Sequence, residues 1–300
     1  MTDAAITKKD PRVFYALAWM SGALIAFSAI AVTGRFAAQG ATTLDIMFYR
    51  SLMSLVVITG IVVAGPGLPK MRTTLFPMHL LRAVTHFVGQ YSWLAALTLI
   101  PLAQLFALEF TAPIWVALLA PLLLRERLTG TRAAAAAMGF LGLLIVSRPG
   151  MVPFSAGVAL ALLCAVGFAL SMLFTKSLTT NNEGPLRILF YMFLIQAAMS
   201  LLLLFGGVRL LDWATLGWIF GLSIAGLSAH YALVRAFSLV DAIIVAPMDF
   251  LRLPLIAVVG ALFYAEPLDP IVLLGGAVII AGNMINLWGE RRARTAQASS

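Results

Sequence analysis

Long apolar stretches follow one another along this chain, with only short polar breaks between them. Hydrophobic residues make up 62% of the 300 residues and charged residues 11%, a composition that excludes a water-soluble fold. About 20 apolar residues are needed to cross the hydrocarbon core of a bilayer, and a helix satisfies its own backbone groups there. We therefore predict an all-α integral membrane protein with ten transmembrane helices. The predicted spans are Val13–Val32, Ile46–Gly65, Pro77–Leu97, Leu102–Leu124, Thr131–Ser147, Ser155–Thr175, Leu186–Phe205, Trp213–Arg235, Ala242–Tyr264 and Pro270–Gly289.

The two halves of the chain resemble each other at an offset of 140 residues. Pairs at this offset are Glu109 with Asp249, Glu126 with Glu266, Gly142 with Gly282, and Tyr91 with Tyr231. Each copy holds five of the predicted spans, and because five is odd, the second copy must enter the membrane from the opposite side. Inverted repeats of this kind are a common plan of secondary transporters. We predict a tail over 1–12, a first repeat over 13–150, a second over 151–289 and a tail over 290–300.

Positive charge is distributed unevenly between the loops. If the N-terminus is cytoplasmic, thirteen Lys and Arg residues face the cytoplasm and three, Arg35, Arg148 and Arg209, face the other side. Cytoplasmic loops carry this excess in membrane proteins. We therefore expect both termini in the cytoplasm and the chain in a bacterial inner membrane. The net charge of +8 follows from the same bias and from anionic lipid, so nucleic-acid binding is not expected.

The third span carries a polar stripe. Its members recur at spacings of three or four residues and so share one helix face: His79, Arg82, His86, Gln90 and Trp93. A polar stripe that runs through the membrane favours a wetted substrate path. The alternative for His79 and Arg82 is that they lie at the interface and extend their polar ends into water.

Two carboxylates are expected near the membrane midplane. Glu109 lies about 12 Å into the fourth span at 1.5 Å per residue, and it has no charged neighbour at helical spacing in that span. Ionisable groups at this depth usually have a partner or a function. Asp249 occupies the related position in the ninth span and lies three residues from Arg252, so these two could form a purely structural pair. We interpret Arg50, close to the end of the second span, as structural.

Helix breakers and small residues complete the architecture. Prolines inside the fourth and ninth spans, Pro113, Pro121, Pro247 and Pro254, each remove a backbone hydrogen bond and can bend the helix. Small residues in the fifth and tenth spans provide smooth faces for close helix approach, either inside the chain or in a homodimer.

Two other functional classes, a membrane-embedded enzyme and a channel, receive little support. The sequence lacks His-Glu-x-x-His, Gly-x-Ser-x-Gly and a nucleotide-binding Gly-Lys-Ser/Thr, so we expect neither catalysis nor ATP-driven pumping, and no cofactor or metal. Channels usually display rings of repeated ligands, whereas the polar groups here are few and single.

Several motifs resemble one known family. The run from Pro113 through Arg125-Glu-Arg-Leu-Thr to Gly139-Phe-Leu-Gly, and the second copy from Pro254 through Ala265-Glu-Pro-Leu-Asp to Gly282, are similar to EamA repeats of the drug/metabolite transporter superfamily. The resemblance covers essentially the whole chain. It implies a carrier whose third, fourth, eighth and ninth spans, with the first and sixth, surround a substrate cavity.

The resemblance also implies a small-metabolite substrate. We predict a secondary transporter for a zwitterionic or cationic metabolite, with amino-acid export as the main prediction and S-adenosylmethionine uptake as the alternative. The candidate substrate-binding residues are His79, Arg82, His86, Gln90, Trp93, Glu109, Asp249 and Arg252, together with His230 and Tyr231. The last two are the second-copy counterparts of Gln90 and Tyr91.

Overall fold

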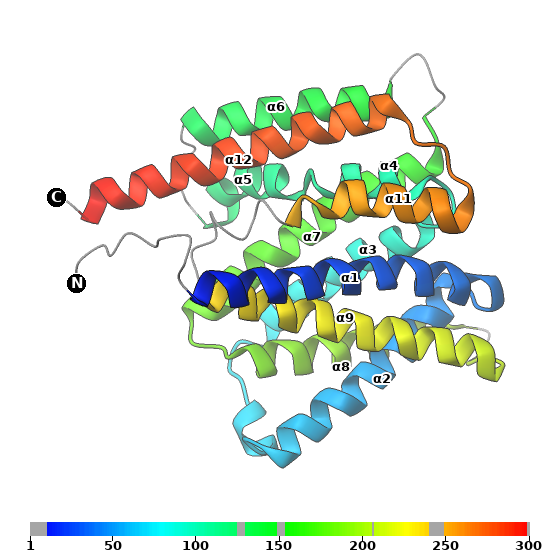
Figure 1. Ribbon diagram of the computed structural model, residues 1–300. Coiled ribbons are helices and arrows are strands. Elements are labelled where there is room, and N and C mark those ends of the chain that lie inside the picture. Colours follow the sequence, from blue (N-terminus) through cyan, green and yellow to red (C-terminus); the bar gives the residue numbers. More distant parts are fainter. Residues whose placement is uncertain (1–10, 125–129, 149–153, 206, 240–248, 299–300) are drawn as a thin grey trace.

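The computed structural model describes residues 11–124, 130–148, 154–205, 207–239 and 249–298. These residues form helices joined by short connections (Figure 1). The helices are α1 (Pro11–Gly40), α2 (Thr43–Ala64), the short 3₁₀ helix η1 (Leu68–Met71), α3 (Phe76–Ala96), α4 (Leu102–Glu109), α5 (Ala112–Leu124), α6 (Gly130–Ser147), α7 (Ala156–Thr180), α8 (Pro185–Leu203), α9 (Trp213–Leu239), α11 (Arg252–Tyr264) and α12 (Pro270–Ala298).

Most predicted spans lie close to the observed helices, and the differences have local causes. Helix α1 continues past the predicted end at Val32 to Gly40. The polar residues Thr33, Arg35 and Gln39 do not end the helix, because the other residues of this segment are apolar or small. Helix α12 continues through most of the predicted tail. The first part of the predicted ninth span, the residue Glu126 and the N-terminal ten residues lie outside the described residues.

The fourth span is broken in the middle. Helix α4 ends at Glu109 and α5 begins at Ala112, one residue before Pro113, whose ring cannot sit beneath the carbonyl group of Glu109. The break leaves the carbonyl oxygen of Phe110 without a helical partner, and the side chain of Asn283 in α12 donates to it at 3.0 Å. In the second repeat, α11 begins at Arg252, two residues before Pro254, so both repeats interrupt this span near the same position.

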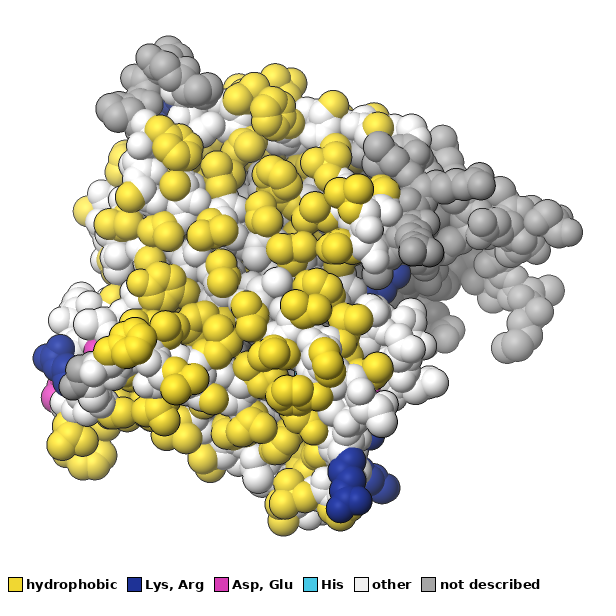
Figure 2. Space-filling view, turned by 180° about the vertical axis from the view of Figure 1, so that it is seen from behind, with side chains coloured by type: hydrophobic (Ala, Val, Ile, Leu, Met, Phe, Trp, Pro, Cys, Tyr) yellow, Lys and Arg dark blue, Asp and Glu magenta, His cyan; other side chains and the backbone are white. Residues whose placement is uncertain are grey.

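The surface and helix lengths suit a bilayer. Among the described residues, six stretches have the length and composition of a membrane span: Phe14–Gly40, Thr43–Ala64, Leu102–Leu123, Ala156–Thr180, Pro185–Leu203 and Pro270–Gly289. Figure 2 shows one face of the molecule covered with hydrophobic side chains, while Lys and Arg gather at its margins. Helix α1 begins and α12 ends at the same end of the bundle (Figure 1), which we call the termini end. The opposite end is the far end.

Helices of one repeat pack against helices of the other. Helix α1 lies along α9, α3 along α7, α6 along α12 and α2 along α8. A two-fold exchange of the repeats turns the first span into the sixth and the third into the eighth. It therefore converts the α1/α9 pair into the α7/α3 pair and leaves the other two pairs unchanged. This is the contact pattern that an inverted five-helix repeat produces.

Glycines bring α6 and α12 into backbone contact. A Cβ atom on Gly142 would lie 2.7 Å from the carbonyl oxygen of Gly275, and one on Gly275 would lie 2.9 Å from the carbonyl oxygen of Gly142. The small faces predicted for the fifth and tenth spans thus cover each other within the chain, as close-packed membrane helices do. The alternative of a homodimer would need a different surface.

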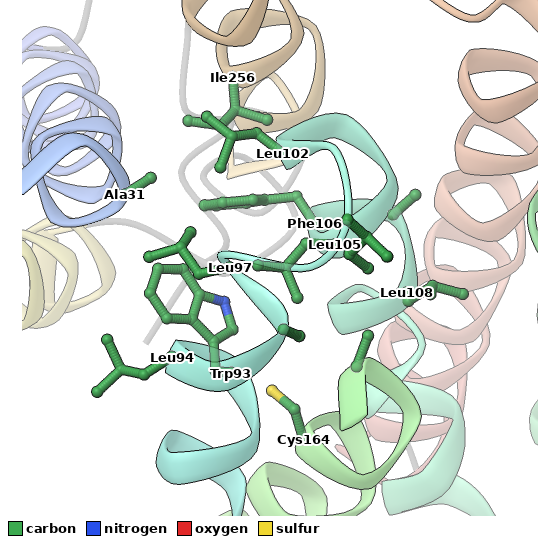
Figure 3. Close-up of a cluster of buried hydrophobic side chains, with 14 of the residues drawn as sticks. Ala31, Trp93, Leu94, Leu97, Leu102, Leu105, Phe106, Leu108, Cys164 and Ile256 are labelled. Carbon is green, nitrogen blue, oxygen red and sulfur yellow. The ribbon is translucent and has the colours of Figure 1, made fainter. Parts of the chain in front are cut away.

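The largest buried apolar cluster lies where α3, α4 and α7 meet. Figure 3 shows Trp93 of α3 beside Leu97, with Phe106 of α4 above it and Cys164 of α7 below. The rings of Trp93 and Phe106 meet edge to face, with centroids 5.9 Å apart. This packing fixes the indole of Trp93 at the edge of the polar site described below.

A group of polar contacts joins the two repeats at the far end, and we call it the far-end clasp. The Arg35 guanidinium donates from Nε to the carbonyl of Leu97 at 2.7 Å and from Nη2 to that of Ile100 at 2.9 Å. It also forms an ion pair with Glu266 and lies 4.6 Å from the ring centroid of Tyr264. Glu266 in turn accepts from the backbone N–H of Leu102 at 2.8 Å. The clasp links α1, the start of α4 and the end of α11.

Candidate polar site between the helices

The polar stripe of α3 faces neighbouring helices along its length. From the termini end inward, His79 contacts Glu183 and Arg82 Nε donates to Thr175 Oγ1 of α7 at 3.2 Å. One turn deeper, His86 Nδ1 lies 2.8 Å from Gln196 Nε2 of α8. The stripe is therefore an interior face and not a surface one.

The first member of the stripe belongs to a contact at the termini end. His79 Nε2 lies 3.3 Å from Glu183, which also accepts from Thr73 Oγ1 at 2.7 Å and from Arg187 Nη1 at 2.9 Å. Burial alone would raise the pKa of Glu183, but these hydrogen bonds outweigh it and hold the pKa below its usual value. Glu183 thus stays ionised and ties the start of α3 to the start of α8. A surface hollow of about 360 Å³ adjoins this contact and includes none of the ten candidate residues.

At the other end of the stripe, Trp93 reaches the predicted carboxylate. Its Nε1–H donates to Glu109 Oε2 at 2.8 Å. The second oxygen of Glu109 lies 3.6 Å from Arg252 Nη1, and Arg252 Nη2 lies 3.2 Å from Asp249 Oδ2. Glu109 therefore finds its partners on α3 and α11, as its lack of a charged neighbour within the fourth span implied. The Asp249–Arg252 pair expected from the three-residue spacing also forms.

Aromatic rings surround the Arg252 guanidinium. Its central carbon lies 4.2 Å from the ring centroid of Phe27 in α1, 4.9 Å from that of Phe110 and 5.6 Å from that of Phe106. Cation–π contacts of this kind hold a guanidinium in place while leaving its edge available for hydrogen bonds. We call the group of Trp93, Glu109, Asp249 and Arg252, with these three Phe rings, the central site.

The two candidate residues on α9, His230 and Tyr231, face different surroundings. The His230 ring lies 6.1 Å from the Phe27 ring, and its Nδ1 pairs with the carbonyl oxygen of Gly226 at 2.8 Å, so it joins the interior group. The structure does not bring Tyr231 to that group. Its side chain is 58% exposed and meets Trp19 edge to face on the outside of the bundle, because consecutive helical residues point about 100° apart.

Two interior residues, Arg50 and Gln196, are not among the candidates from the sequence. Arg50 is only 6% exposed, because α2 starts at Thr43 and not at Ile46, which places Arg50 about two turns into the helix. Gln196 is fully buried and reaches His86. The predicted helix start at Ile46 is too late, so the sequence places Arg50 close to the end of the span and predicts a structural role. Gln196 carried no signal beyond a single amide in an apolar span.

Comparisons with known proteins agree with this architecture. The EamA-like transporter family matches the chain twice, over residues 14–148 and 155–288. The chain belongs to the EamA-like transporter family. The predicted all-helical membrane fold with two EamA repeats is confirmed. This EamA protein is a multi-pass transmembrane transporter of small metabolites and not an enzyme.

Relatives of this EamA protein carry different metabolites. The S-adenosylmethionine uptake transporter of Rickettsia felis is 26% identical over 95% of this chain and 96% of the relative. The riboflavin transporter of Rhizobium johnstonii is 32% identical over 75% of each chain. A solved crystal structure with 16% sequence identity shares the fold over 93% of this chain and 98% of its own, with a TM-score of 0.63.

Proposed function

We propose that this protein carries S-adenosylmethionine, or a closely similar zwitterion with an aromatic ring, across the membrane by alternating access. The related uptake transporters support this function better than the amino-acid export that the sequence alone predicts. The chemistry of the central site agrees. It combines carboxylates, a guanidinium and aromatic rings within one interior group, and S-adenosylmethionine carries a sulfonium and an ammonium, a carboxylate, and an adenine ring.

The central site carries the proposal because its charges are only partly used within the protein. Asp249 Oδ1 and Arg252 Nε are buried and have no hydrogen-bond partner among the described residues. Buried polar atoms without a partner are costly. A bound molecule that supplies a cation to Asp249 and an acceptor to Arg252 would remove that cost. The Phe27, Phe106 and Phe110 rings would flank the bound aromatic group.

Riboflavin is the second candidate, because a relative at 32% identity carries it. The riboflavin ring system is uncharged near neutral pH. It would stack on the same aromatic rings but would supply no cation to the unpartnered Oδ1 atom of Asp249. We therefore rank riboflavin below the zwitterion.

Alternating access is supported by the repeat symmetry and by the far-end clasp. The clasp holds the far end together across both repeats, so opening that end requires Arg35 to leave Leu97, Ile100 and Glu266. The inverted repeats imply that the termini end has a related closed arrangement, as in other inverted-repeat carriers.

Counterflow into liposomes tests the substrate. Vesicles containing the purified protein and unlabelled S-adenosylmethionine should accumulate labelled S-adenosylmethionine, with saturation, faster than labelled riboflavin or labelled amino acids. Trp93→Phe removes the donor to Glu109 while keeping an aromatic ring, and it should lower this flux. Arg209→Gln, in an exposed loop, serves as the control and should transport normally. Accumulation of amino acids without S-adenosylmethionine would restore the amino-acid reading.

A further inference from the structure

Four helices near the central site bring together basic and amide side chains, and no carboxylate of the described residues belongs to this group. Its members are Arg50 of α2, Arg82 and His86 of α3, Gln196 of α8 and His230 of α9. Helix α2 packs against α3, α8 and α9, and α3 packs against α8, where His86 Nδ1 lies 2.8 Å from Gln196 Nε2. His86 also lies within electrostatic range of Arg50, Arg82 and His230, so the members form one cluster across these helices. We call it the basic cluster.

Both arginines of the basic cluster are deeply buried. Arg50 is 6% and Arg82 8% exposed. Arg50 Nε, Arg50 Nη1 and Arg82 Nη1 have no hydrogen-bond partner among the described residues, and neither arginine forms an ion pair there. Within the described part of the chain, Arg82 makes one side-chain hydrogen bond, from its Nε to the Thr175 hydroxyl. A buried guanidinium without an anionic partner is strongly disfavoured, so the cluster calls for an anion from outside the described protein groups.

Four carboxylates of the described residues pair with groups other than Arg50 and Arg82. Glu109 and Asp249 are held by Trp93 and Arg252, and Glu183 is held by Thr73, His79 and Arg187. Asp45 caps the start of α2 by accepting from the backbone N–H of Thr42 at 3.0 Å. None of these four carboxylates is paired with Arg50 or Arg82 in the structure.

Helix α9 passes beside the Arg50 guanidinium. A Cβ atom on Gly226 of α9 would lie 3.5 Å from Arg50 Nη2, an ordinary van der Waals distance. One turn along α9, the His230 ring pairs with the Gly226 carbonyl oxygen and also lies beside Phe27 of the central site. Phe27 thus connects the basic cluster with Arg252, and one elongated molecule can reach both groups.

We propose that the basic cluster is the carboxylate-binding half of the substrate site, with Arg50 and Arg82 as the residues that bind the carboxylate. This assignment rests on the proposed zwitterionic substrate and fixes its orientation: the anionic end lies toward α2 and α8, and the cationic and aromatic ends lie toward α4 and α11. Gln196 is a positioning residue, because its Nε2 holds His86 at Nδ1 and so directs the other ring nitrogen of His86.

S-adenosylmethionine and one natural analogue together test the carboxylate end of the substrate. Decarboxylated S-adenosylmethionine keeps the sulfonium, the amine and the adenine but lacks the carboxylate. Binding is measured by calorimetry on the full-length protein in lipid nanodiscs. Hydrogen bonds to charged groups imply that the parent binds S-adenosylmethionine about 10- to 100-fold more tightly than the decarboxylated analogue.

Variants of Arg50 and Arg82 then test whether these residues produce the preference for the carboxylate-bearing compound. In Arg50→Gln and Arg82→Gln the preference for the carboxylate should fall toward one, while Arg50→Lys keeps the charge and should retain part of it. Arg209→Gln removes a charge from an exposed loop and should keep the full preference. Equal binding of the two compounds by the parent protein overturns the proposal, and this comparison does not depend on the folding of any variant. An unchanged preference in both glutamine variants overturns it as well.

A wrong substrate assignment would give a different binding result from a wrong carboxylate site. If neither S-adenosylmethionine compound binds, the substrate assignment is wrong, and the same measurement is made with tryptophan and tryptamine, which differ only in the carboxylate. A preference for tryptophan that is lost in Arg50→Gln supports the basic cluster as a carboxylate site. The absence of such a preference overturns it.

Discussion

Removing the Arg35 side-chain charge should open the far end of the bundle. Arg35→Gln loses the ion pair to Glu266, the cation–π contact with Tyr264 and at least one of the two hydrogen bonds to the Leu97 and Ile100 carbonyls. Hydrogen bonds to charged groups contribute about 1.5–3 kcal/mol each, and partial exposure reduces the ion-pair contribution. We therefore expect a loss of about 2–4 kcal/mol from the closed far end, a roughly 30- to 700-fold change in the ratio of open to closed forms.

Cysteine accessibility measures this shift directly. The native Cys164 is replaced by alanine, and Ala31, which is fully buried one turn below Arg35, is replaced by cysteine. The rate at which a bulky charged maleimide labels this cysteine in nanodiscs reports opening of the far end. Labelling should accelerate in Arg35→Gln, and it should stay at the parent rate in the loop control Arg209→Gln.

A second variant, Glu266→Gln, tests the far-end clasp independently. Glu266→Gln weakens the same contacts from the other repeat, both with Arg35 and with the backbone N–H of Leu102. If neither Arg35→Gln nor Glu266→Gln changes the labelling rate, the clasp is only a loop contact and the far end is held closed by apolar packing.

Three further predictions concern stability and orientation. Gly142→Ala should destabilise the protein by about 1–3 kcal/mol, because its Cβ would meet α12 backbone, whereas Gly60→Ala in α2, with nothing within 4 Å of the added atom, should be neutral or stabilising in thermal unfolding. Burial acts to raise the pKa of Asp269, but the Arg148 hydrogen bond and nearby backbone N–H groups outweigh it, so the pKa in the folded protein is lowered. This contact therefore stabilises the fold at pH values above the unfolded carboxyl pKa. Thermal scans should show that stabilisation fading as pH falls through the lower folded value, and Asp269→Asn should lack this acid dependence. A reporter that is active only in the periplasm should be silent when fused after Ser300, and periplasmic activity would reverse the predicted orientation.

The sequence was sufficient for the architecture because the determining signals are local or periodic. Apolar length defined the spans, the 140-residue offset defined the repeats, and Pro113 and Pro254 marked the interrupted spans near Phe110 and Leu251. These signals act through backbone geometry, which depends little on distant residues.

The site was less predictable because its contacts join distant parts of the chain. His86 meets Gln196, 110 residues away, and Trp19 meets Tyr231 on the outer surface, where the repeat comparison alone placed no partner. The offset equates positions in the two repeats but not their surroundings: Tyr91 packs against the main apolar cluster, whereas its counterpart Tyr231 faces outward. An error of one turn at the start of α2 was enough to make Arg50 look interfacial.

The pairing of helices between the repeats also governs how the protein is made. Helix α1 leaves the ribosome first, yet its main partner α9 begins at Trp213, so about 10–35 s of synthesis separate them at 5–20 residues per second. Helices α2, α3 and α6 wait in the same way for α8, α7 and α12. During this interval the Arg50 and Arg82 side chains are in the membrane without the helices that later enclose them. A fragment that ends after α6 should therefore remain a set of inserted but unpacked helices, open to membrane proteases, until the second repeat is synthesised.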